Sequence, residues 1–143
     1  MRGIIVTGHG NFATGISSSV QLIAGEQEYY KAVDFGSEDT PDMLKNNLRA
    51  AIEQLADCSE IIIFTDLIGG SPFKTAVELS YEQSEKLVVL SGTNLGMLID
   101  GVSSRDAKDS LATLIENTLD TGRKQVVQFQ PVNELEISEG EGI

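Results

Sequence analysis

One histidine, His9, occurs in the whole chain, and it lies between Gly8 and Gly10, shortly after the apolar run Ile4-Ile5-Val6. Because glycines have no side chain that could cover the ring and let the backbone turn sharply, we expect this imidazole to be reachable from outside. Imidazole titrates near neutral pH, so it can act as a nucleophile or carry a proton. A turn histidine that only hydrogen-bonds a neighbouring loop fits the pattern as well, so both interpretations stay open at this point.

A second group of candidate residues follows the apolar run at 61–64. Asp66 comes shortly after this run, and Gly69-Gly70-Ser71-Pro72 begins the next helical pattern. A hydroxyl residue at the cap with proline in the first turn is typical of a helix start, and the glycines let a ligand approach the backbone closely. Because first-turn amides and the helix dipole attract anions, this helix start is suited to a phosphoryl group, although an ordinary capped helix is the simpler interpretation. The expected phosphoryl-binding residues are Gly70, Ser71 and Phe73.

Short apolar runs alternate with longer stretches of helical period, which predicts alternating strands and helices. We expect strands at residues 3–7, 29–35, 60–65, 86–90 and 125–130. We expect helices at residues 13–24, 40–55, 71–84, 95–100 and 104–121, the first ending at Gly25 and the last at Gly122. The run at 60–65 is apolar without alternation, so it predicts a central strand covered on both faces. The fold class is therefore α/β, with a doubly wound parallel sheet, helices on both faces and right-handed crossovers.

The expected fold brings the chemistry-bearing loops to one edge of the sheet. In such folds ligands bind beyond the carboxyl ends of the strands, where the His9 loop, the Asp66 loop and the loop at 91–95 should open. If the first and third strands are neighbours, the Asp66 carboxylate can bond one ring nitrogen of His9 and leave the other with an outward lone pair. Asp66 could also simply cap a turn.

A neutral histidine oriented in this way could attack the phosphorus of an incoming phosphohistidine. Asp66 would stabilise the positive charge that develops on the ring, and backbone amides at Ser71 would hold the phosphoryl oxygens. The chain has no Gly-Lys-Ser or Gly-Lys-Thr sequence, with which a glycine-rich phosphate-binding loop ends, so a nucleoside triphosphate is not the obvious donor.

Composition limits the class of protein further. The chain has 143 residues, 41% of them hydrophobic, which predicts one compact domain over residues 1–131, followed by an acidic tail without structure over 132–143. A net charge of -12 disfavours nucleic acid and anionic membranes as partners. One cysteine and one histidine exclude an internal disulfide and a familiar zinc cage, so we expect no metal and no cofactor. No segment reaches the apolar length of a membrane span or a signal peptide, so we expect a cytoplasmic protein.

Three motifs, in this order and spacing over residues 1 to about 130, carry a family resemblance. They are Gly8-His9-Gly10 with Phe12-Ala13 and Gly15, then Thr65-Asp66-Leu67 with Gly69-Gly70-Ser71-Pro72-Phe73, then Ser91-Gly92 with Asn94-Leu95 and Met97-Leu98. The set resembles the IIA component of the mannose-family (mannose, fructose, sorbose, N-acetylgalactosamine) phosphoenolpyruvate-dependent sugar phosphotransferase system. The resemblance implies that His9 accepts a phosphoryl group from the histidine-containing phosphocarrier protein and passes it to a IIB component. The membrane IIC and IID components would be indirect partners.

The resemblance also assigns roles to single residues and implies an assembly. Asp66 matches the aspartate that hydrogen-bonds the active histidine, and Ser71 matches the serine at the phosphoryl-binding helix start. The family implies a homodimer that exchanges its last strand, so residues 125–130 would add antiparallel to the partner's sheet. The chain departs from the family at Lys74, which replaces the usual asparagine and adds a positive charge, and at Gly96, which replaces proline and would loosen its loop.

Three alternatives from other classes stay open. The run 8–13 fits the G-x-G-x-x-A fingerprint of a dinucleotide-binding module, with Asp34 as the acid that binds ribose. A receiver-type signalling domain also places an acid after its third strand, as Asp66 does, and a hydroxyl residue after its fourth, as Ser91 does. The first strand lacks the acids that such a domain uses to hold magnesium. A phosphocarrier subunit of a dihydroxyacetone kinase would have the same fold.

Overall fold

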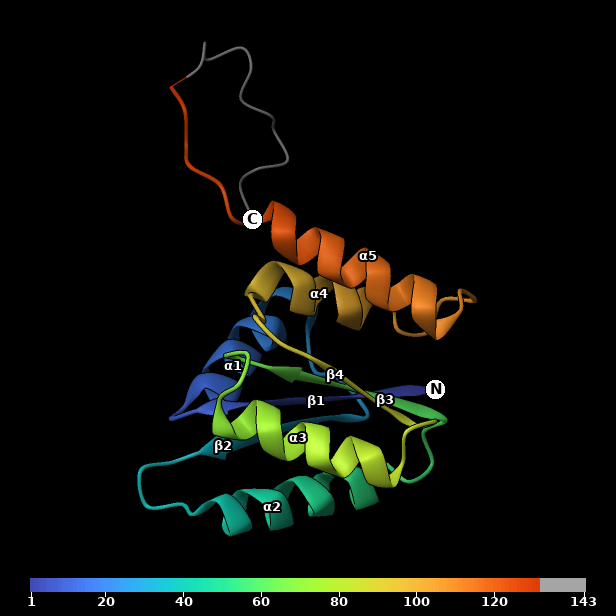
Figure 1. Cartoon of the computed structure of the whole chain (residues 1–143). Helices are drawn as coiled ribbons and strands as arrows, with labels where there is room; N and C mark the ends of the chain where they lie inside the picture. Colours follow the sequence, from blue (N-terminus) through green and yellow to red (C-terminus); the bar gives the residue numbers. More distant parts are fainter. Residues whose placement is uncertain (132–143) are drawn as a thin grey trace.

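A computed structural model describes residues 1–131 as strands and helices in strict alternation until the last two helices (Figure 1). The elements are, in chain order, β1 (Arg2–His9), α1 (Phe12–Ala24), β2 (Tyr30–Phe35), α2 (Pro41–Gln54), β3 (Glu60–Thr65), α3 (Ser71–Glu82), β4 (Leu87–Leu90), α4 (Leu95–Ser104) and α5 (Leu111–Lys124). The expected α/β class and the four expected strands before residue 91 are confirmed. The expected tail at 132–143 lies outside the described residues.

The four strands form one parallel sheet in the order β2-β1-β3-β4. The chain winds outward from β1 to β2 and then returns to the other side of β1 to continue through β3 to β4. The winding direction therefore reverses between β1 and β3. In open α/β sheets, the crevice beyond the carboxyl ends of such a strand pair is where ligands bind.

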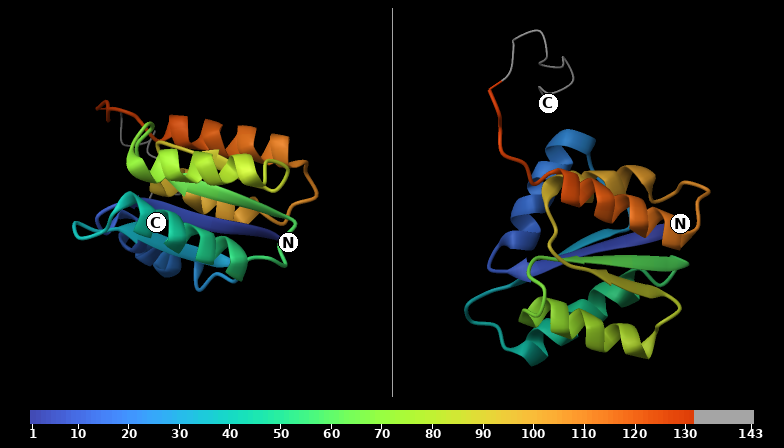
Figure 2. Two further views of the ribbon diagram at one scale, coloured as in Figure 1. Left: turned by 60° about the horizontal axis from the view of Figure 1, so that its bottom comes forward. Right: turned by 45° about the horizontal axis from the view of Figure 1, so that its top comes forward.

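The central strand β3 shows how the sequence covers both faces of the sheet. Helices α2 and α3 cover one face of the sheet, and α1 and α4 cover the other (Figure 2). Ile61 and Ile63 pack in the first of these layers, whereas Ile62 and Phe64 pack in the second. Side chains of a strand alternate between the two faces of the sheet. Because helices cover both faces, all four side chains are fully buried. The expectation of a central strand covered on both sides is confirmed.

The boundaries of the last two helices differ from those expected. The short turn expected at 95–100 is a full helix to Ser104, and α5 starts only at Leu111, where the Ser110 hydroxyl accepts a hydrogen bond from Thr113 N (3.2 Å). Gly122 does not end α5 but lies buried within it. A Cβ there would be 2.7 Å from Sδ of Met97, so the glycine serves the close packing of α5 on α4.

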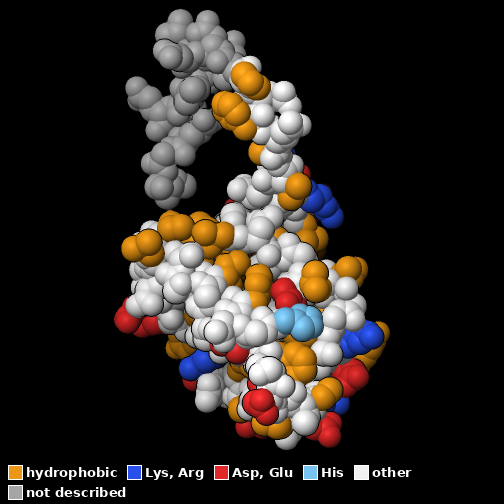
Figure 3. All heavy atoms as spheres, turned by 90° about the vertical axis from the view of Figure 1, so that its left-hand side faces the viewer, with side chains coloured by type: hydrophobic (Ala, Val, Ile, Leu, Met, Phe, Trp, Pro, Cys, Tyr) orange, Lys and Arg blue, Asp and Glu red, His pale blue; other side chains and the backbone are white. Residues whose placement is uncertain are grey.

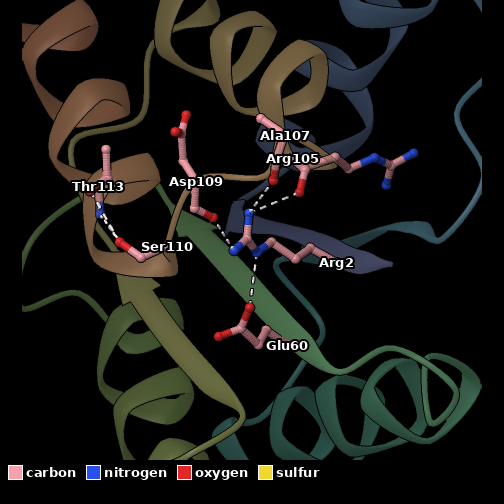
Figure 4. A network of polar contacts seen from close by, with 7 residues as sticks. All are labelled: Arg2, Glu60, Arg105, Ala107, Asp109, Ser110 and Thr113. Atoms are coloured by element: carbon pink, nitrogen blue, oxygen red, sulfur yellow. Dashed lines mark hydrogen bonds and ion pairs between the residues drawn. The ribbon is translucent and has the colours of Figure 1, made fainter.

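The connection between α4 and α5 is fixed at the amino edge of the sheet by Arg2 (Figure 4). Arg2 pairs with Glu60 on the neighbouring strand (Nε to Oε1, 2.9 Å) and donates to the carbonyl oxygens of Arg105 (3.2 Å) and Asp109 (2.8 Å). The buried Arg105 guanidinium in turn donates to the carbonyl of Glu28 (2.6 Å). These bonds hold the two ends of the α4–α5 segment in place and leave the carboxyl edge clear for a site.

Residues 125–130, expected as a strand, pair with no strand in the described part of the chain. The segment leaves α5 and runs away from the body of the molecule (Figure 1), with the side chains of Val126, Val127 and Phe129 exposed. A strand needs a partner backbone to satisfy its N–H and C=O groups, and this segment meets no such strand within residues 1–131.

We expect substitution by alanine to change the free energy of unfolding in opposite directions at two helix glycines, Gly101 and Gly15. A Cβ at Gly101 would lie 2.8 Å from Cζ of the fully buried Phe64, so Gly101→Ala should lower the free energy of unfolding by about 1–2 kcal/mol. Gly15 has nothing within 4 Å of the same position and is exposed, so Gly15→Ala should raise the free energy of unfolding by up to about 1 kcal/mol. Urea denaturation measures both, and equal stabilisation by the two variants would contradict this account of α4 packing.

Candidate functional site

His9 is the last residue of β1 rather than part of a turn after it. The strand runs two residues further than expected, and Gly8 and His9 lie in register with Asp34 and Phe35 of β2. A Cβ at Gly8 would lie 2.5 Å from the Phe12 ring, so glycine is required there for α1 to approach. The turn begins at Gly10, which has a φ of 58° and donates to the Phe35 carbonyl (2.7 Å). The backbone on both sides of the imidazole is therefore held in place.

The Asp66 carboxylate binds both the backbone and the ring of His9. Oδ2 of Asp66 lies 2.8 Å from the His9 backbone nitrogen and 2.7 Å from Nδ1, and Oδ1 accepts from Leu67 N (2.8 Å). Partial burial raises the pKa of the Asp66 carboxyl, but the N–H groups of His9 and Leu67 outweigh it and hold the pKa below its ordinary value. An ionised carboxylate only accepts hydrogen bonds, so Nδ1 is the donor and the lone pair of the neutral ring lies on Nε2.

The loop that follows β4 fixes the backbone of Asp66 from the other side. Gly92 N donates to the Asp66 carbonyl (2.9 Å), and Thr93 N donates to the Thr65 carbonyl (3.1 Å). Asn94 caps α4 through Met97 N (3.1 Å) and donates from Nδ2 to the Gly122 carbonyl. All three expected loops thus meet at one edge of the sheet.

The start of α3 lies against the outer side of the imidazole. A Cβ at Gly70 would be 2.8 Å from Cε1 and 3.5 Å from Nε2 of His9, so a side chain at this position would displace the ring. Gly70, not Ser71, is the cap residue of α3, and Ser71 is the first helical residue. The expected capping by the Ser71 hydroxyl is therefore wrong, because this hydroxyl lies inside the first turn. The N–H groups of Ser71 and Phe73 belong to the first turn, where a helix offers them no acceptor.

The imidazole is open to solvent, and apolar side chains border it. The His9 side chain is 45% exposed, compared with 12% for Asp66. Figure 3 shows the histidine on the outer surface, next to hydrophobic side chains and an acidic one. Leu67 and Ile68, on the same loop as Asp66, are large and exposed, and the Phe35 ring meets the imidazole edge to face at 6.0 Å. An open apolar rim suits contact with a macromolecule better than enclosure of a small molecule.

The acid expected for nucleotide binding has another role. Asp34 accepts from the backbone N (3.0 Å) and the hydroxyl (2.7 Å) of Thr14, in the first turn of α1. In a dinucleotide-binding module, the helix start holds the pyrophosphate and the acid holds the ribose. Here the acid neutralises the helix start itself, which argues against the nucleotide alternative.

Two further observations concern the described part of the chain. None of its helices is long and apolar enough to cross a membrane. In residues 1–131, no group of three or more histidine, cysteine or acidic side chains is arranged to hold a metal ion.

The structure also clarifies what the sequence could not indicate about the site. The contact of Phe35 with the ring and the bonding of Asp34 to Thr14 depend on the register of β1 and β2, which no local pattern reveals. Gly96, which was expected to loosen a loop, is the second residue of α4. The space that a side chain would take there is filled by the side chain of Gln125.

Fold and site together define a class of protein. The strand order is the flavodoxin-like one, and the reversal of winding between β1 and β3 carries an oriented imidazole beside a helix start. The chain is thus a doubly wound α/β protein with a solvent-exposed histidine that is hydrogen-bonded to an aspartate.

Comparison with known proteins identifies the family within this class. The chain belongs to the EIIA-man family, described as "PTS system fructose IIA component", whose model matches residues 3–119. IIA components of the phosphotransferase system (PTS) are phosphotransfer proteins of sugar uptake.

Single relatives agree with the family assignment. The chain is 28% identical over 123 residues to the mannose-specific EIIAB component of Escherichia coli K12. The matched stretch covers 86% of this chain, but the chain spans only 38% of the length of that relative. It is 32% identical over 97 residues to the sorbose-specific EIIA component of Lacticaseibacillus casei, covering 68% and 69% of the two chains. The crystal structure of component EIIA from Streptococcus agalactiae superposes with a TM-score of 0.82 at 36% identity, covering 90% of this chain and 97% of that one.

The lowered pKa of Asp66 predicts how stability depends on pH. Because the folded pKa lies below the unfolded value of about 3.9, the ionised carboxylate stabilises the fold fully above roughly pH 5. This stabilisation is lost as the pH falls through the folded pKa. Asp66→Asn should therefore lower the free energy of unfolding by about 1–2 kcal/mol at pH 7, and the difference from wild type should shrink below roughly pH 4.

Denaturant titrations from pH 3 to pH 7 measure this difference. Asp57→Asn, which removes an exposed acid after α2, controls for the change in net charge. A deficit of Asp66→Asn that stays constant over the whole range would show that the ionised carboxylate does not supply the stabilisation.

Proposed function

We propose that the protein is a cytoplasmic phosphocarrier that accepts a phosphoryl group on His9 and passes it on during sugar uptake. The donor is the histidine-containing phosphocarrier protein, and the acceptor is a IIB component, which serves the membrane IIC and IID components. The observation that carries the proposal is the pairing of Nδ1 with Asp66, which leaves Nε2 of His9 facing Gly70 at the start of α3.

The geometry supports a direct transfer between two imidazoles. The Nε2 lone pair of His9 attacks the phosphorus of the donor's phosphohistidine, and the donor's N–P bond breaks with its electron pair staying on the donor ring. His9 keeps its Nδ1 proton throughout, and Asp66 balances the positive charge that the ring gains. The first-turn amides of Ser71 and Phe73 are donors for the phosphoryl oxygens. Transfer to the IIB component is the same step in reverse, with that protein as the nucleophile.

The openness of the ring supports a protein as donor and acceptor. A phosphohistidine on another protein can reach a nitrogen only if both surfaces come together around it, and the His9 side chain is 45% exposed within an apolar rim. The net charge of -12 argues against nucleic acid as a further partner. A dihydroxyacetone kinase subunit with the same site would pass its group to a kinase-bound nucleotide, so the acceptor distinguishes the two functions.

We further propose that the active form is a homodimer in which residues 125–130 are exchanged as an antiparallel edge strand. The outer edge of β4 lies beside an open, mostly apolar groove of about 590 Å³, lined by Val88, Leu111, Ile115 and Leu119 among others. The exposed apolar side chains of residues 126–129 are suited to such a groove. A paired edge would also satisfy the backbone groups that β4 leaves open.

Phosphorylation of His9 is the first test of this function. Incubation with phosphoenolpyruvate and the two general phosphotransferase proteins should place one acid-labile phosphate on wild type and none on His9→Ala. Asp66→Asn should keep the fold but slow the transfer by about 10- to 100-fold, because the ring loses the carboxylate that sets its tautomer. Asp57→Asn should transfer at the wild-type rate.

Two results would contradict the assignment. Label retained by His9→Ala would place the phosphate on another residue, and a wild-type rate in Asp66→Asn would remove the role of the carboxylate. Transfer from the labelled protein to a nucleotide on a kinase, with none to a IIB component, would favour the dihydroxyacetone kinase subunit.

Truncation tests the exchanged strand. A chain that ends at Lys124 keeps α5 complete but lacks the segment 125–130, so it should sediment as a monomer in analytical ultracentrifugation. A chain that ends at Pro131 removes only residues 132–143 and should remain a dimer. The exchange is wrong if both truncated chains show the same state of association.

A further inference from the structure

Lys74 lies one helical turn after the residue that faces the imidazole. Its backbone N–H donates to the carbonyl of Gly70 (2.9 Å), so the two residues are four positions apart along α3. Residues at this spacing share a helix face, and helical side chains lean toward the helix start. A side chain at Gly70 would run into Cε1 and Nε2 of His9. The exposed Lys74 side chain therefore leans toward the side of the ring that carries the lone pair.

Lys74 carries the only positive charge on the loops and helix starts at this edge of the sheet, and Arg123 reaches the edge from the end of α5, beside Ser91 and Gly92. Among the loops and helix starts at residues 8–16, 35–44, 66–74 and 91–98, Lys74 is the only lysine or arginine. The acids in the same segments are Glu38, Asp39, Asp42 and Asp66. In the part of the chain that the structure describes, the five ion pairs involve other residues, and Glu78, four residues after Lys74 on α3, pairs with Lys45 instead.

The position of Lys74 is also unfavourable for the helix itself. A cation in the first turn opposes the positive end of the helix dipole, and α3 has no acid in its first turn to offset it. The lysine therefore does not serve the stability of α3. An anion bound at the start of α3 would attract the Lys74 ammonium and so offset its repulsion by the helix dipole.

We propose that Lys74 binds the phosphoryl group on His9, with its ammonium paired to a phosphoryl oxygen. This inference rests on the phosphocarrier function proposed above. Lys74 keeps its proton and forms no covalent bond, and it favours the phosphorylated protein and the more negative form of the phosphoryl group. It also compensates part of the repulsion between a phosphoryl group and a chain of net charge -12.

Three variants separate charge from structure. Lys74→Gln removes the ammonium, Lys74→Arg keeps a positive charge, and Lys108→Gln removes an exposed charge from the α4–α5 connection at the opposite edge of the sheet. Each protein is phosphorylated with phosphoenolpyruvate and the general phosphotransferase proteins. Phosphorus NMR then gives the pH at which the phosphoryl group titrates, and the equilibrium with the phosphorylated donor gives the loaded fraction.

Lys74→Gln should raise the pH at which the phosphoryl group titrates and lower the equilibrium constant for loading about two- to fivefold, as expected for an exposed ion pair. Lys74→Arg and Lys108→Gln should match wild type. Raising the salt concentration should bring wild type close to Lys74→Gln but change the variant little. The unphosphorylated Lys74→Gln protein should be at least as stable as wild type, because the unfavourable dipole contact is gone.

The possible failures are distinguishable. If wild type loads His9 but Lys74→Gln titrates and loads as wild type does, the role of Lys74 is wrong and the phosphocarrier function stands. If Lys108→Gln shows the same change, the effect is one of net charge and Lys74 has no specific contact. If wild type takes no phosphate on His9, the proposed function fails and this inference fails with it.

Discussion

The hydrogen bond from Nδ1 of His9 to the Asp66 carboxylate joins two segments that are 57 residues apart, and the remainder of the site depends on it. It fixes the ring tautomer, because an ionised carboxylate can only accept. It also fixes the direction of the ring, since the same oxygen binds the backbone N–H of His9. A ring held at one nitrogen has one nitrogen left for chemistry, and that nitrogen faces Gly70 at the start of α3.

The fold provides this bond through the reversal of winding between β1 and β3. These two strands are neighbours, so their carboxyl ends deliver His9 and Asp66 to the same place. The two faces of β3 bury alternate apolar side chains against different helix pairs, which makes the strand pair a rigid base. Two loops then complete the support, with Gly92 bonded to the Asp66 carbonyl and Gly10 bonded to the Phe35 carbonyl. These bonds hold the backbone around His9 in place while the imidazole itself stays accessible to solvent.

The sequence predicted the contact between His9 and Asp66 better than it predicted some of the elements around it. Apolar runs located the four strands, and the expectation that Asp66 meets His9 needed only the assumption that β1 and β3 are adjacent. Local patterns could not reveal contacts that depend on register, such as the meeting of Phe35 with the ring. The prediction that Gly122 ends its helix was wrong, because a glycine required for close packing against Met97 cannot be told in the sequence from one that ends a helix. The segment 125–130 has the composition of a strand, but composition does not reveal which strand, if any, a segment pairs with.

Nitrogen-15 NMR of the ring nitrogens in the phosphorylated protein shows which nitrogen of His9 carries the phosphoryl group. We expect phosphorus coupling at Nε2, together with a protonated Nδ1 that remains hydrogen-bonded to Asp66. A phosphoryl group on Nδ1, with Nε2 protonated, would require the bond to Asp66 to break, and Asp66 would then not orient the ring for transfer.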